Sequence, residues 1–229
     1  MNVIFCGYRN WAINIINTVS KHPKIDSYKI IHSKEEYDNE KHSFKEDIDF
    51  ILFIGWSWII PREVTEKYLC VGIHPSDLPL FRGGSPLQHQ IIQGIKESKV
   101  TLMTLSSDKL DGGHIWCKED LSLEGDSMAK VFENLENSSI KLLNNFIDNY
   151  DEIEPVLPKL EEGTYFKRRK PEESVLSFEQ MKSMELEELY NFIRSLTDPY
   201  PNACLVDAKG NKLFFKEVSF EKAKKDNQN

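Results

Sequence analysis

The segment Ile48–Trp56, IDFILFIGW, constrains the fold more than any other part of the chain. A nearly continuous apolar run of this length is typical of a strand that is buried on both faces. Such strands occur in parallel sheets whose two faces are covered by helices. Two shorter runs, Asn2–Gly7 and Cys70–His74, predict further strands of the same kind. These runs together indicate an α/β fold.

Helical patterns alternate with these strands. The segment Trp11–Val19 places its apolar residues near helical spacing, and Pro61 opens a second helix over REVTEKYL. The helix Pro86–Ile95 begins with proline in its first turn, where a missing N–H group costs nothing. A strand is predicted at Tyr28–Ser33, followed by a polar loop from Lys34 to Glu46. This alternation favours a mostly parallel sheet flanked by helices.

The second half of the chain changes in character. Two strands, Val100–Leu105 and His114–Leu123, are predicted to pair around SSDKLDGG, and a long amphipathic helix is predicted at Ser127–Tyr150. We expect one domain over residues 1–158 and a small α+β subdomain with a tail over 159–229. The subdomain is expected to hold a basic loop, a helix, a turn and two short strands, at Thr164–Ser174, Leu186–Leu196, Asp198–Asn202, Ala203–Ala208 and Lys212–Val218. The tail from Lys222 is predicted to be disordered.

Charge and composition exclude several classes of protein. The 229 residues carry a formal net charge of -8, which disfavours nucleic-acid partners because binding to phosphate backbones draws on clustered Lys and Arg. No apolar stretch approaches the length of about 18 residues that a membrane span needs. The four cysteines lie far apart, and the N-terminus shows no basic leader. We expect a reduced, cytoplasmic protein of bacterial type, with no membrane partner.

A stiff loop follows the predicted strand Cys70–His74. His74 stands at the carboxyl end of that strand, the edge where doubly wound sheets bind their ligands. Pro75 and Pro79 restrict the backbone beside it, which favours a side chain held for function over a merely structural histidine. Asp111 precedes two glycines that would let the backbone approach a ligand closely, although an aspartate there can also be a turn former.

Cysteine and histidine pairs raise a metal site as an alternative. Cys70 with His74, and His114 with Cys117, superficially resemble zinc ligand pairs of a hydrolase. Residues four apart on a strand are separated by about 13 Å, which is too far for one zinc ion. No metal is expected, and Cys70 and Cys117 are predicted to be core thiols.

Three motifs carry a resemblance to a known family. His74–Pro79 (HPSDLP), Arg82–Pro86 (RGGSP) and Leu110–Gly113 (LDGG) resemble the 10-formyltetrahydrofolate-dependent formyltransferases, over roughly residues 1–150. The resemblance implies a Rossmann-like catalytic domain, N10-formyltetrahydrofolate as co-substrate, His74 as general acid and base, and Asp111 as its partner. It also implies a folate pocket lined by Trp56, Ser57, Trp58, Ile60, Ser107, Leu110 and Asp111.

Gly72 departs from that family's pattern. The family has Asn-x-His, whose asparagine amide donates to the oxyanion, whereas this chain has Gly72-Ile73-His74. Loss of one oxyanion donor commonly costs about 10²- to 10³-fold in kcat. The replacement donor is the His74 imidazolium, the hydroxyl of Ser76 or Ser85, or a water. The alternative is a pseudoenzyme that only binds folate.

The segment after residue 158 bears on the acceptor. Arg168–Ser174 and Phe192–Ala203 are similar to the C-terminal region of sugar N-formyltransferases, and we do not expect the further basic domain that methionyl-tRNA formyltransferases carry. The resemblance implies a nucleotide-linked amino sugar for surface glycan synthesis, with a glycinamide-type formyltransferase as the alternative. The form HPSDLPLFRGGSPLQ is similar to formyltransferases of pseudaminic acid pathways, whose acceptor is a UDP-4-amino-4,6-dideoxy-N-acetyl-altrosamine.

Several residues are predicted to bind this acceptor. They are Ser76, Asp77, Arg82, Gly83, Gly84, Ser85, Arg194 and Tyr200. Taken alone, Arg194 and Tyr200 could equally pack within the subdomain, and the basic run from Arg168 to Lys170 could be a solvated loop. A dTDP- or GDP-linked sugar remains open as the acceptor, and a homodimer is compatible with this interpretation.

Overall fold

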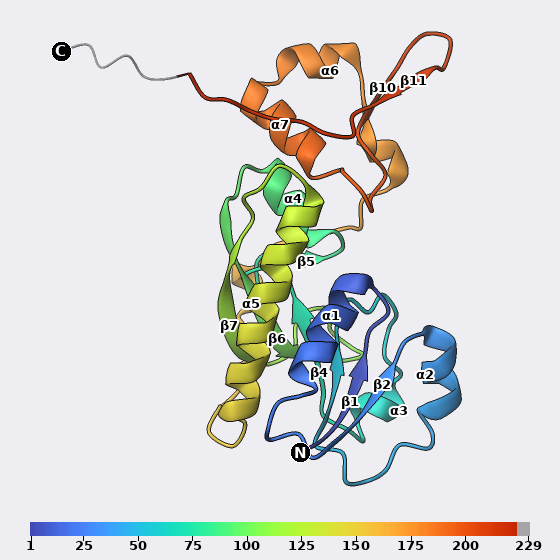
Figure 1. Cartoon of the computed structure of the whole chain (residues 1–229), viewed down its shortest axis with the longest axis vertical. Helices are drawn as coiled ribbons and strands as arrows, with labels where there is room; N and C mark the ends of the chain where they lie inside the picture. Colours follow the sequence, from blue (N-terminus) through green and yellow to red (C-terminus); the bar gives the residue numbers. More distant parts are fainter. Residues whose placement is uncertain (224–229) are drawn as a thin grey trace, which may run out of the picture.

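A six-stranded sheet forms the centre of the molecule (Figure 1). The computed structural model describes residues 1–223 and gives the strand order β2-β1-β3-β4-β6-β7. Strands β1 to β4 are parallel, whereas β6 is antiparallel to both β4 and β7. The bounds are β1 Asn2–Cys6, β2 Ser27–Ile31, β3 Phe50–Phe53, β4 Cys70–His74, β6 Glu97–Thr104 and β7 Ile115–Ser122. This confirms the Rossmann-like, mostly parallel arrangement.

Strand β3 is buried on both of its faces, as IDFILFIGW predicts. Phe50 and Leu52 belong to one hydrophobic cluster, and Ile51 and Phe53 belong to the other. Helices α1 and α5 supply the first cluster and contact each other, and α2 and α3 supply the second. Their bounds are α1 Asn10–Val19, α2 Lys34–Glu40, α3 Arg62–Thr65 and α5 Met128–Asp148. Alternating side chains along one strand therefore hold both helical layers against the sheet.

The prediction of a loop from Lys34 to Glu46 is wrong, because helix α2 occupies the first half of that segment. The hydroxyl of Ser33 accepts a hydrogen bond from the backbone N–H of Glu36 at 3.0 Å, which caps the helix. The carboxylate of Glu36 in turn accepts from the backbone N–H of His32 at 2.7 Å. Tyr37 fixes the helix to the sheet, since its side chain is buried in the second cluster. The helix predicted from Pro61 is shorter than expected and ends at Thr65.

The last helices and strands of the chain, α6, α7, β10 and β11, lie at the end of the molecule away from the N-terminus (Figure 1). They belong to the part of the chain after Pro158. It contains a three-stranded sheet, β11-β10-β9, with helices α6 Phe178–Ser183 and α7 Leu186–Arg194, so the expected α+β content is present. The strands are β9 Val175–Leu176, β10 Cys204–Val206 and β11 Lys212–Phe214. The division into two domains stays a prediction. Most of the predicted tail, residues 224–229, lies outside the described residues.

A two-stranded sheet joins this part to the first half of the chain. The predicted basic loop contains β8, Tyr165–Phe166, which pairs in parallel with β5, Arg82–Gly83. Strand β5 precedes helix α4, Pro86–Ile92, which lies slightly inside the predicted helix. Helix α4 also contacts α7. Within residues 1–223, no helix is both long and apolar enough to span a membrane.

Candidate active site

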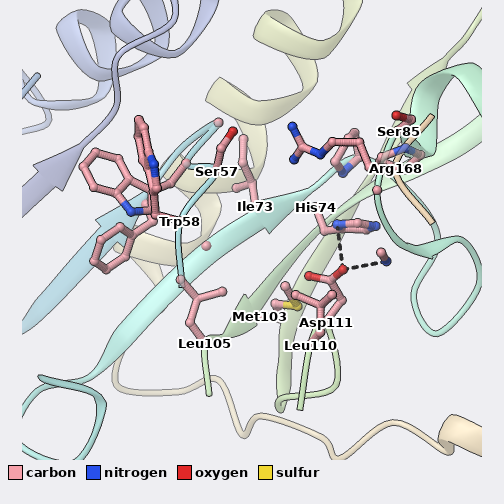
Figure 2. A pocket seen from close by; sticks show the side chains of 18 of the residues that line it. Ser57, Trp58, Ile73, His74, Ser85, Met103, Leu105, Leu110, Asp111 and Arg168 are labelled. Atoms are coloured by element: carbon pink, nitrogen blue, oxygen red, sulfur yellow. Dashed lines mark hydrogen bonds and ion pairs between the residues drawn. The ribbon is translucent and has the colours of Figure 1, made fainter. Parts of the chain in front are cut away.

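A cavity of about 530 Å³ opens at the carboxyl edge of the parallel strands. Arg9 follows β1, Trp56 follows β3 and Pro75 follows β4, and all three line it. Parallel strands present their loops at this edge, which is where open α/β sheets bind ligands. Figure 2 shows Ser57 and Trp58 on one side of the cavity and His74, Asp111, Ser85 and Arg168 on the other.

His74 is the last residue of β4, and its side chain is held on two sides. Its Nε2 lies 2.9 Å from the carbonyl oxygen of Phe81, and its Nδ1 lies 3.7 Å from Oδ2 of Asp111. The residue is only 6% exposed, yet it lines the cavity. A buried imidazole beside a carboxylate at a ligand-binding edge has the geometry of a general acid and base.

Asp111 reaches His74 from the tip of the β6–β7 hairpin. The Oδ2 atom of Asp111 accepts a hydrogen bond from the backbone N–H of Gly83 at 2.8 Å, shown by the second dashed line in Figure 2. The backbone of Asp111 has a positive φ of 50°. A Cβ atom on Gly113 would lie 1.9 Å from the carbonyl oxygen of Thr104, so that glycine serves hairpin closure rather than the expected approach to a ligand.

An aromatic wall forms the side of the cavity opposite the pair. Trp56 and Trp58 meet edge to face with ring centroids 5.0 Å apart, and Tyr8 packs on Trp58 at 4.9 Å. The Tyr8 and Ser57 hydroxyls are 2.8 Å apart. Within the described residues, the buried indole N–H of Trp56 has no hydrogen-bond partner. Apolar ring faces suit a flat ring such as a pterin.

Every residue predicted for the folate pocket lines this one cavity. The set combines the turn after β3 with the hairpin loop that carries Asp111. The residues are Trp56, Ser57, Trp58, Ile60, Ser107, Leu110 and Asp111. The structure therefore brings the two predicted segments together, although their role in folate binding stays a prediction.

A polar and basic wall completes the cavity. The predicted acceptor residues Gly83, Gly84, Ser85 and Tyr200 line it. Arg9, Arg168 and the buried Gln88 also line it, and sequence reasoning did not assign them to the site. The position of Arg9 directly after a predicted parallel strand could have indicated it.

The side chain of Tyr200 is largely buried in this wall. Burial raises the pKa of the Tyr200 hydroxyl, and a hydrogen bond with Gln88 and the charges of Arg9 and Arg168 offset part of that rise. The Tyr200 ring also packs on Phe132, with centroids 6.1 Å apart. The phenol is therefore neutral at physiological pH and can donate a hydrogen bond into the cavity.

Four other predicted acceptor residues lie outside the cavity lining. The hydroxyl of Ser76 is buried and donates to the carbonyl of Leu80 at 2.7 Å, and Asp77 pairs with Lys118 at 2.5 Å. The other two predicted residues are bound to the backbone elsewhere. The Nη2 group of Arg82 donates to the carbonyl of Leu160 at 3.4 Å, and the Nη1 group of Arg194 donates to the carbonyls of Leu123 and Gly125 at 2.7 and 3.1 Å. The structure does not bring these four side chains to the cavity.

The space beside Gly72 is occupied by a neighbouring side chain. A Cβ atom at position 72 would lie 3.0 Å from both terminal methyl carbons of Leu105. Leu105 follows β6 and lines the cavity, so it fills the place toward which a longer side chain at position 72 would extend. Gly72 and Leu105 are therefore matched in size.

The cysteines do not assemble a metal site with their histidine neighbours. Within residues 1–223, there is no group of three or more His, Cys, Asp and Glu side chains that could hold a metal ion. Burial raises the pKa of Cys70 to about 12, and burial followed by the charge of Glu119 raises that of Cys117 to about 12. The zinc alternative is not supported in this part of the chain, and both residues behave as core thiols.

Known proteins are similar to this chain in both sequence and fold. Residues 8–145 match the model of the formyl transferase family. Methionyl-tRNA formyltransferase of Rickettsia canadensis is 36% identical over 138 residues, which are 59% of this chain and 45% of that protein. The chain thus spans about half the length of the curated relatives it matches.

Solved structures extend the likeness over nearly the whole chain. A methionyl-tRNA formyltransferase from Clostridium thermocellum has a TM-score of 0.80 and 33% identity, covering 96% of this chain and 94% of that one. A sugar N-formyltransferase from a Shewanella species has a TM-score of 0.75 and 18% identity, covering 98% and 99%. HypX from Aquifex aeolicus in complex with tetrahydrofolic acid has a TM-score of 0.71 and 19% identity, covering 89% and 35%.

The family model covers more than half of the chain, from the first turn of the sheet to the end of α5, and both members of the His74 and Asp111 pair lie inside it. The chain therefore belongs to the formyl transferase family.

Proposed function

We propose that this protein transfers a formyl group from N10-formyltetrahydrofolate to the amino group of a nucleotide-linked amino sugar. The observation that carries the proposal is one cavity with the His74 and Asp111 pair between an aromatic wall and a basic wall. The aromatic wall suits the donor, and the basic wall suits an anionic acceptor. The formyl carbon and the attacking amine would meet at the pair.

The donor side of the proposal rests on Trp56 and Trp58. Their rings offer apolar surface against which a flat ring can pack. N10-formyltetrahydrofolate would supply the formyl group as an activated amide. The tetrahydrofolic acid bound to the HypX structure supports folate as the donor for a chain of this fold.

The pair supplies the proton transfers. An amine must be neutral to attack the formyl carbon, and it loses a proton as the new C–N bond forms. His74 would take that proton and pass it to the leaving N10 nitrogen, and the Asp111 carboxylate would stabilise the charged imidazole between these steps. No step in this scheme needs a metal ion.

Two groups of the protein are placed to stabilise the negative charge that develops on the formyl oxygen. The hydroxyl of Ser76 is committed to Leu80 and lies outside the cavity lining, which leaves it poorly placed. The hydroxyl of Ser85 lies at the cavity, where it accepts from the backbone N–H of Arg169 at 3.1 Å and keeps its own proton to donate. The hydroxyl of Ser85 is therefore the proposed hydrogen-bond donor in place of an asparagine at position 72, and the positive charge of the His74 imidazolium would stabilise the oxyanion without a direct hydrogen bond.

The acceptor side of the proposal rests on positive charge. Arg9 and Arg168 line the same cavity as the neutral hydroxyl of Tyr200 and the amide of Gln88. Guanidinium groups bind phosphate oxygens with directed, charge-assisted hydrogen bonds. A diphosphate joining a nucleoside to an amino sugar fits these groups, and the likeness to a sugar N-formyltransferase supports that class. A UDP-4-amino-4,6-dideoxy-N-acetyl-altrosamine is the specific acceptor we propose.

Methionyl-tRNA is the second candidate acceptor. It is favoured by the 36% identity to the Rickettsia canadensis enzyme and by the 33% identity to the structure from Clostridium thermocellum. The net charge of -8 opposes it, because tRNA binding requires the neutralisation of many phosphates by basic side chains.

A panel of acceptors tests the proposal directly. The protein is incubated with 10-formyltetrahydrofolate and, in separate reactions, with UDP-, dTDP- and GDP-linked amino sugars and with methionyl-tRNA. Mass spectrometry then detects the gain of one formyl group. We expect a gain on an amino sugar that is lost in His74→Ala. Formylation of methionyl-tRNA alone would overturn the proposed acceptor class and leave the donor standing.

Folate binding separates a slow enzyme from a protein that only binds folate. Trp56 and Trp58 lie at the proposed donor site, so a stable 5-formyltetrahydrofolate should change the tryptophan fluorescence, and less so in Trp58→Phe. Binding without formyl transfer to any acceptor would indicate a pseudoenzyme. No binding at near-millimolar ligand would contradict the donor site itself.

A further inference from the structure

We infer that Thr164, which directly precedes β8, and Phe166, which ends β8, are positioning residues for the catalytic pair. They hold the backbone of Phe81 so that His74 carries its proton on Nε2 and keeps the lone pair of Nδ1 for catalysis. The inference rests on the proposed role of His74. It assigns a function to the segment after Pro158 that is independent of acceptor binding.

The ring nitrogens of His74 face two different partners. A carbonyl oxygen can only accept a hydrogen bond, so the Nε2 atom that lies 2.9 Å from the Phe81 oxygen must carry a proton. A neutral imidazole has a single N–H group, which leaves Nδ1 with its lone pair. The 3.7 Å from Nδ1 to the Asp111 carboxylate is too long for a hydrogen bond that would draw the proton there.

This tautomer suits the reaction. The proton released by the attacking amine would bind Nδ1, which faces Asp111, and the new positive charge would then lie beside the carboxylate. The proton would leave Nδ1 for N10 of the donor when the N10 to formyl bond breaks. Nε2 keeps its own proton and its hydrogen bond to Phe81 throughout, so the ring need not turn between the two transfers.

Phe81 holds its carbonyl in this place only because other groups fix its backbone. Its φ is 56°, in the left-handed region that is unfavourable for a non-glycine residue. Such a conformation persists where the surrounding structure determines it. The backbone N–H of Phe81 donates to the hydroxyl of Thr164 at 2.8 Å, and its ring stacks on Phe166 with centroids 5.2 Å apart and planes 10° from parallel.

Hydrogen bonds along β5 and β8 extend this support to Asp111. The backbone N–H of Arg82 donates to the carbonyl of Thr164 at 3.0 Å, and that of Gly84 donates to the carbonyl of Phe166 at 2.9 Å. Between them, the N–H of Gly83 donates to Asp111 at 2.8 Å. The four consecutive residues 81–84 therefore present one acceptor to His74 and one donor to Asp111, and hydrogen bonds to Thr164 and Phe166 hold the backbone on both sides of Gly83.

Phe166 is itself anchored from helix α4. His89 stacks on the Phe166 ring with centroids 4.6 Å apart, and its Nε2 lies 3.1 Å from the carbonyl oxygen of Lys167. The segment around Phe166 is thus bound through Thr164 on one side and through Lys167 on the other. Removal of the Phe166 ring or of the Thr164 hydroxyl should loosen the Phe81 carbonyl without removing any group that contacts the substrates.

Nitrogen NMR of histidine tests the tautomer in the free protein. The protein is labelled with ¹⁵N in its histidine rings, and His74 is assigned by the signals lost in His74→Ala. Above the pKa of the ring, we expect a protonated Nε2 and an unprotonated Nδ1 in the wild type. Thr164→Val and Phe166→Ala should each give a mixture of the two tautomers. A protonated Nδ1 in the wild type, or unchanged signals in both variants, would overturn the inference.

Kinetics and matched variants separate positioning from simple packing. Thr164→Val and Phe166→Ala should lower kcat by about 10- to 100-fold with little change in either KM, the size expected when a reacting group is displaced. Thr164→Ser and Phe166→Tyr should restore most of the rate because they keep the hydroxyl and the ring. Lys167→Ala, which changes an exposed side chain in the same segment, should leave kcat and the NMR signals unchanged.

The outcomes also separate this inference from the proposed function. Thr164→Val exchanges a hydroxyl for a methyl group on an exposed residue, so it tests the inference even if Phe166→Ala fails to fold. Full activity of His74→Ala would reject the role of His74 in catalysis, while the NMR result would still show whether β8 fixes the tautomer. Wild-type kcat in Thr164→Val, with a changed tautomer, would reject the tautomer as a determinant of rate.

Discussion

His74 and Asp111 stand far apart in the sequence, and their side chains come within 3.7 Å in the folded chain. Among the ion pairs of residues 1–223, Asp111 supplies the only carboxylate that lies beside the His74 ring. Its charge, rather than its size, is what the proposed mechanism uses. A substitution that removes the charge and keeps the shape therefore isolates the contribution of Asp111.

Asp111→Asn is such a substitution. The amide oxygen can still accept the hydrogen bond from Gly83, so the hairpin should keep its place. We expect kcat for formyl transfer to fall by about 10²-fold or more, because the charged imidazole loses its stabilising partner. The dependence of the rate on pH should change as well, because the negative charge beside the imidazole is removed. A pH profile like that of the wild type would place Asp111 in a merely structural turn.

Position 72 offers a second test at this scale. In Gly72→Asn the new Cβ would press on Leu105 at 3.0 Å, so we expect a lower free energy of unfolding and little or no gain in kcat. Gly72→Asn combined with Leu105→Ala removes that obstruction and is the matched variant. If the oxyanion lacks a donor in the wild type, the double variant should gain up to about 10²-fold over Leu105→Ala in kcat.

A gain of tenfold or more from Gly72→Asn alone would contradict the match between Gly72 and Leu105. Ser85→Ala examines the same question from the other side, because Ser85 is a proposed replacement donor at the cavity. We expect its kcat to fall, whereas Ser76→Ala should chiefly affect stability because Ser76 bonds Leu80. Circular dichroism of each variant checks that the fold is kept.

Local pattern in the sequence places His74 but not its partner. His74 ends an apolar strand and proline stiffens the loop after it, so its position at the carboxyl edge of the sheet can be predicted from these residues. The pairing with Asp111 is implied by the family resemblance, and only the folded chain shows the two side chains 3.7 Å apart. Gln88 carries no such pattern, because its role depends on which side of the cavity it faces, and Arg9 is indicated only by its position after a predicted strand. Ser76, Asp77, Arg82 and Arg194 were predicted to bind the acceptor, but each side chain finds a partner within the protein. Only the folded chain shows that competition.

Helix α2 shows how capping decides an element that periodicity does not. The helix spans only seven residues, and its buried contact with the core is made by Tyr37. Short helices have little stability of their own, so the cap at Ser33 matters more here than in the 21-residue α5. The Ser-x-x-Glu pattern from Ser33 to Glu36 was the available indication in the sequence.

Ser33→Ala should lower the free energy of unfolding by about 1 kcal/mol, because the backbone N–H of Glu36 loses its acceptor. Urea unfolding, followed by circular dichroism, measures the change. Ser33→Asp keeps an acceptor at the same place and should stay within about 0.5 kcal/mol of the wild type. Equal losses in the two variants would show that packing at this position, and not the cap, is responsible.

The strands of the central sheet and the two short strands β5 and β8 differ in how well a sequence can predict them. Strands β1, β3 and β4 are apolar runs whose burial dictates their conformation. Strand β8 has two residues inside a basic segment, and it exists because its backbone pairs with a strand more than eighty positions earlier. Local pattern contains no information on such a partner, so TYFKRRKPEES gave only a loop.

The folded molecule buries several cysteine thiols and a tyrosine hydroxyl whose protons the unfolded chain releases at alkaline pH. Burial raises the pKa of Cys6, and that of Cys70 to about 12; burial and Glu119 raise that of Cys117 to about 12, all above an ordinary value of 9.0. Burial likewise raises the pKa of Tyr37. The folded protein keeps these protons in a pH range where the unfolded chain loses them. The contribution of the thiols to stability is therefore complete below about pH 9 and is lost as the pH rises towards 12.

We expect the free energy of unfolding to fall between about pH 8 and about pH 10.5, by at most about 1.4 kcal/mol per thiol for each pH unit above the unfolded pKa. Urea unfolding under reducing conditions at the two pH values measures the fall. The double variant Cys70→Ala/Cys117→Ala lacks two of these groups and should show a smaller fall. A fall of equal size in that variant would assign the effect to tyrosines and lysines instead.

The pairing of β5 with β8 also has a consequence for the order in which the protein is made. A ribosome synthesises the chain from the amino terminus at about 5–20 residues per second, so all six strands of the central sheet precede Thr164 and Phe166 in time. A nascent chain that ends after α5 contains every strand of that sheet, yet it lacks the segment that holds Phe81 in place. The positions of His74 and Asp111 can therefore be fixed in full only after β8 has been synthesised.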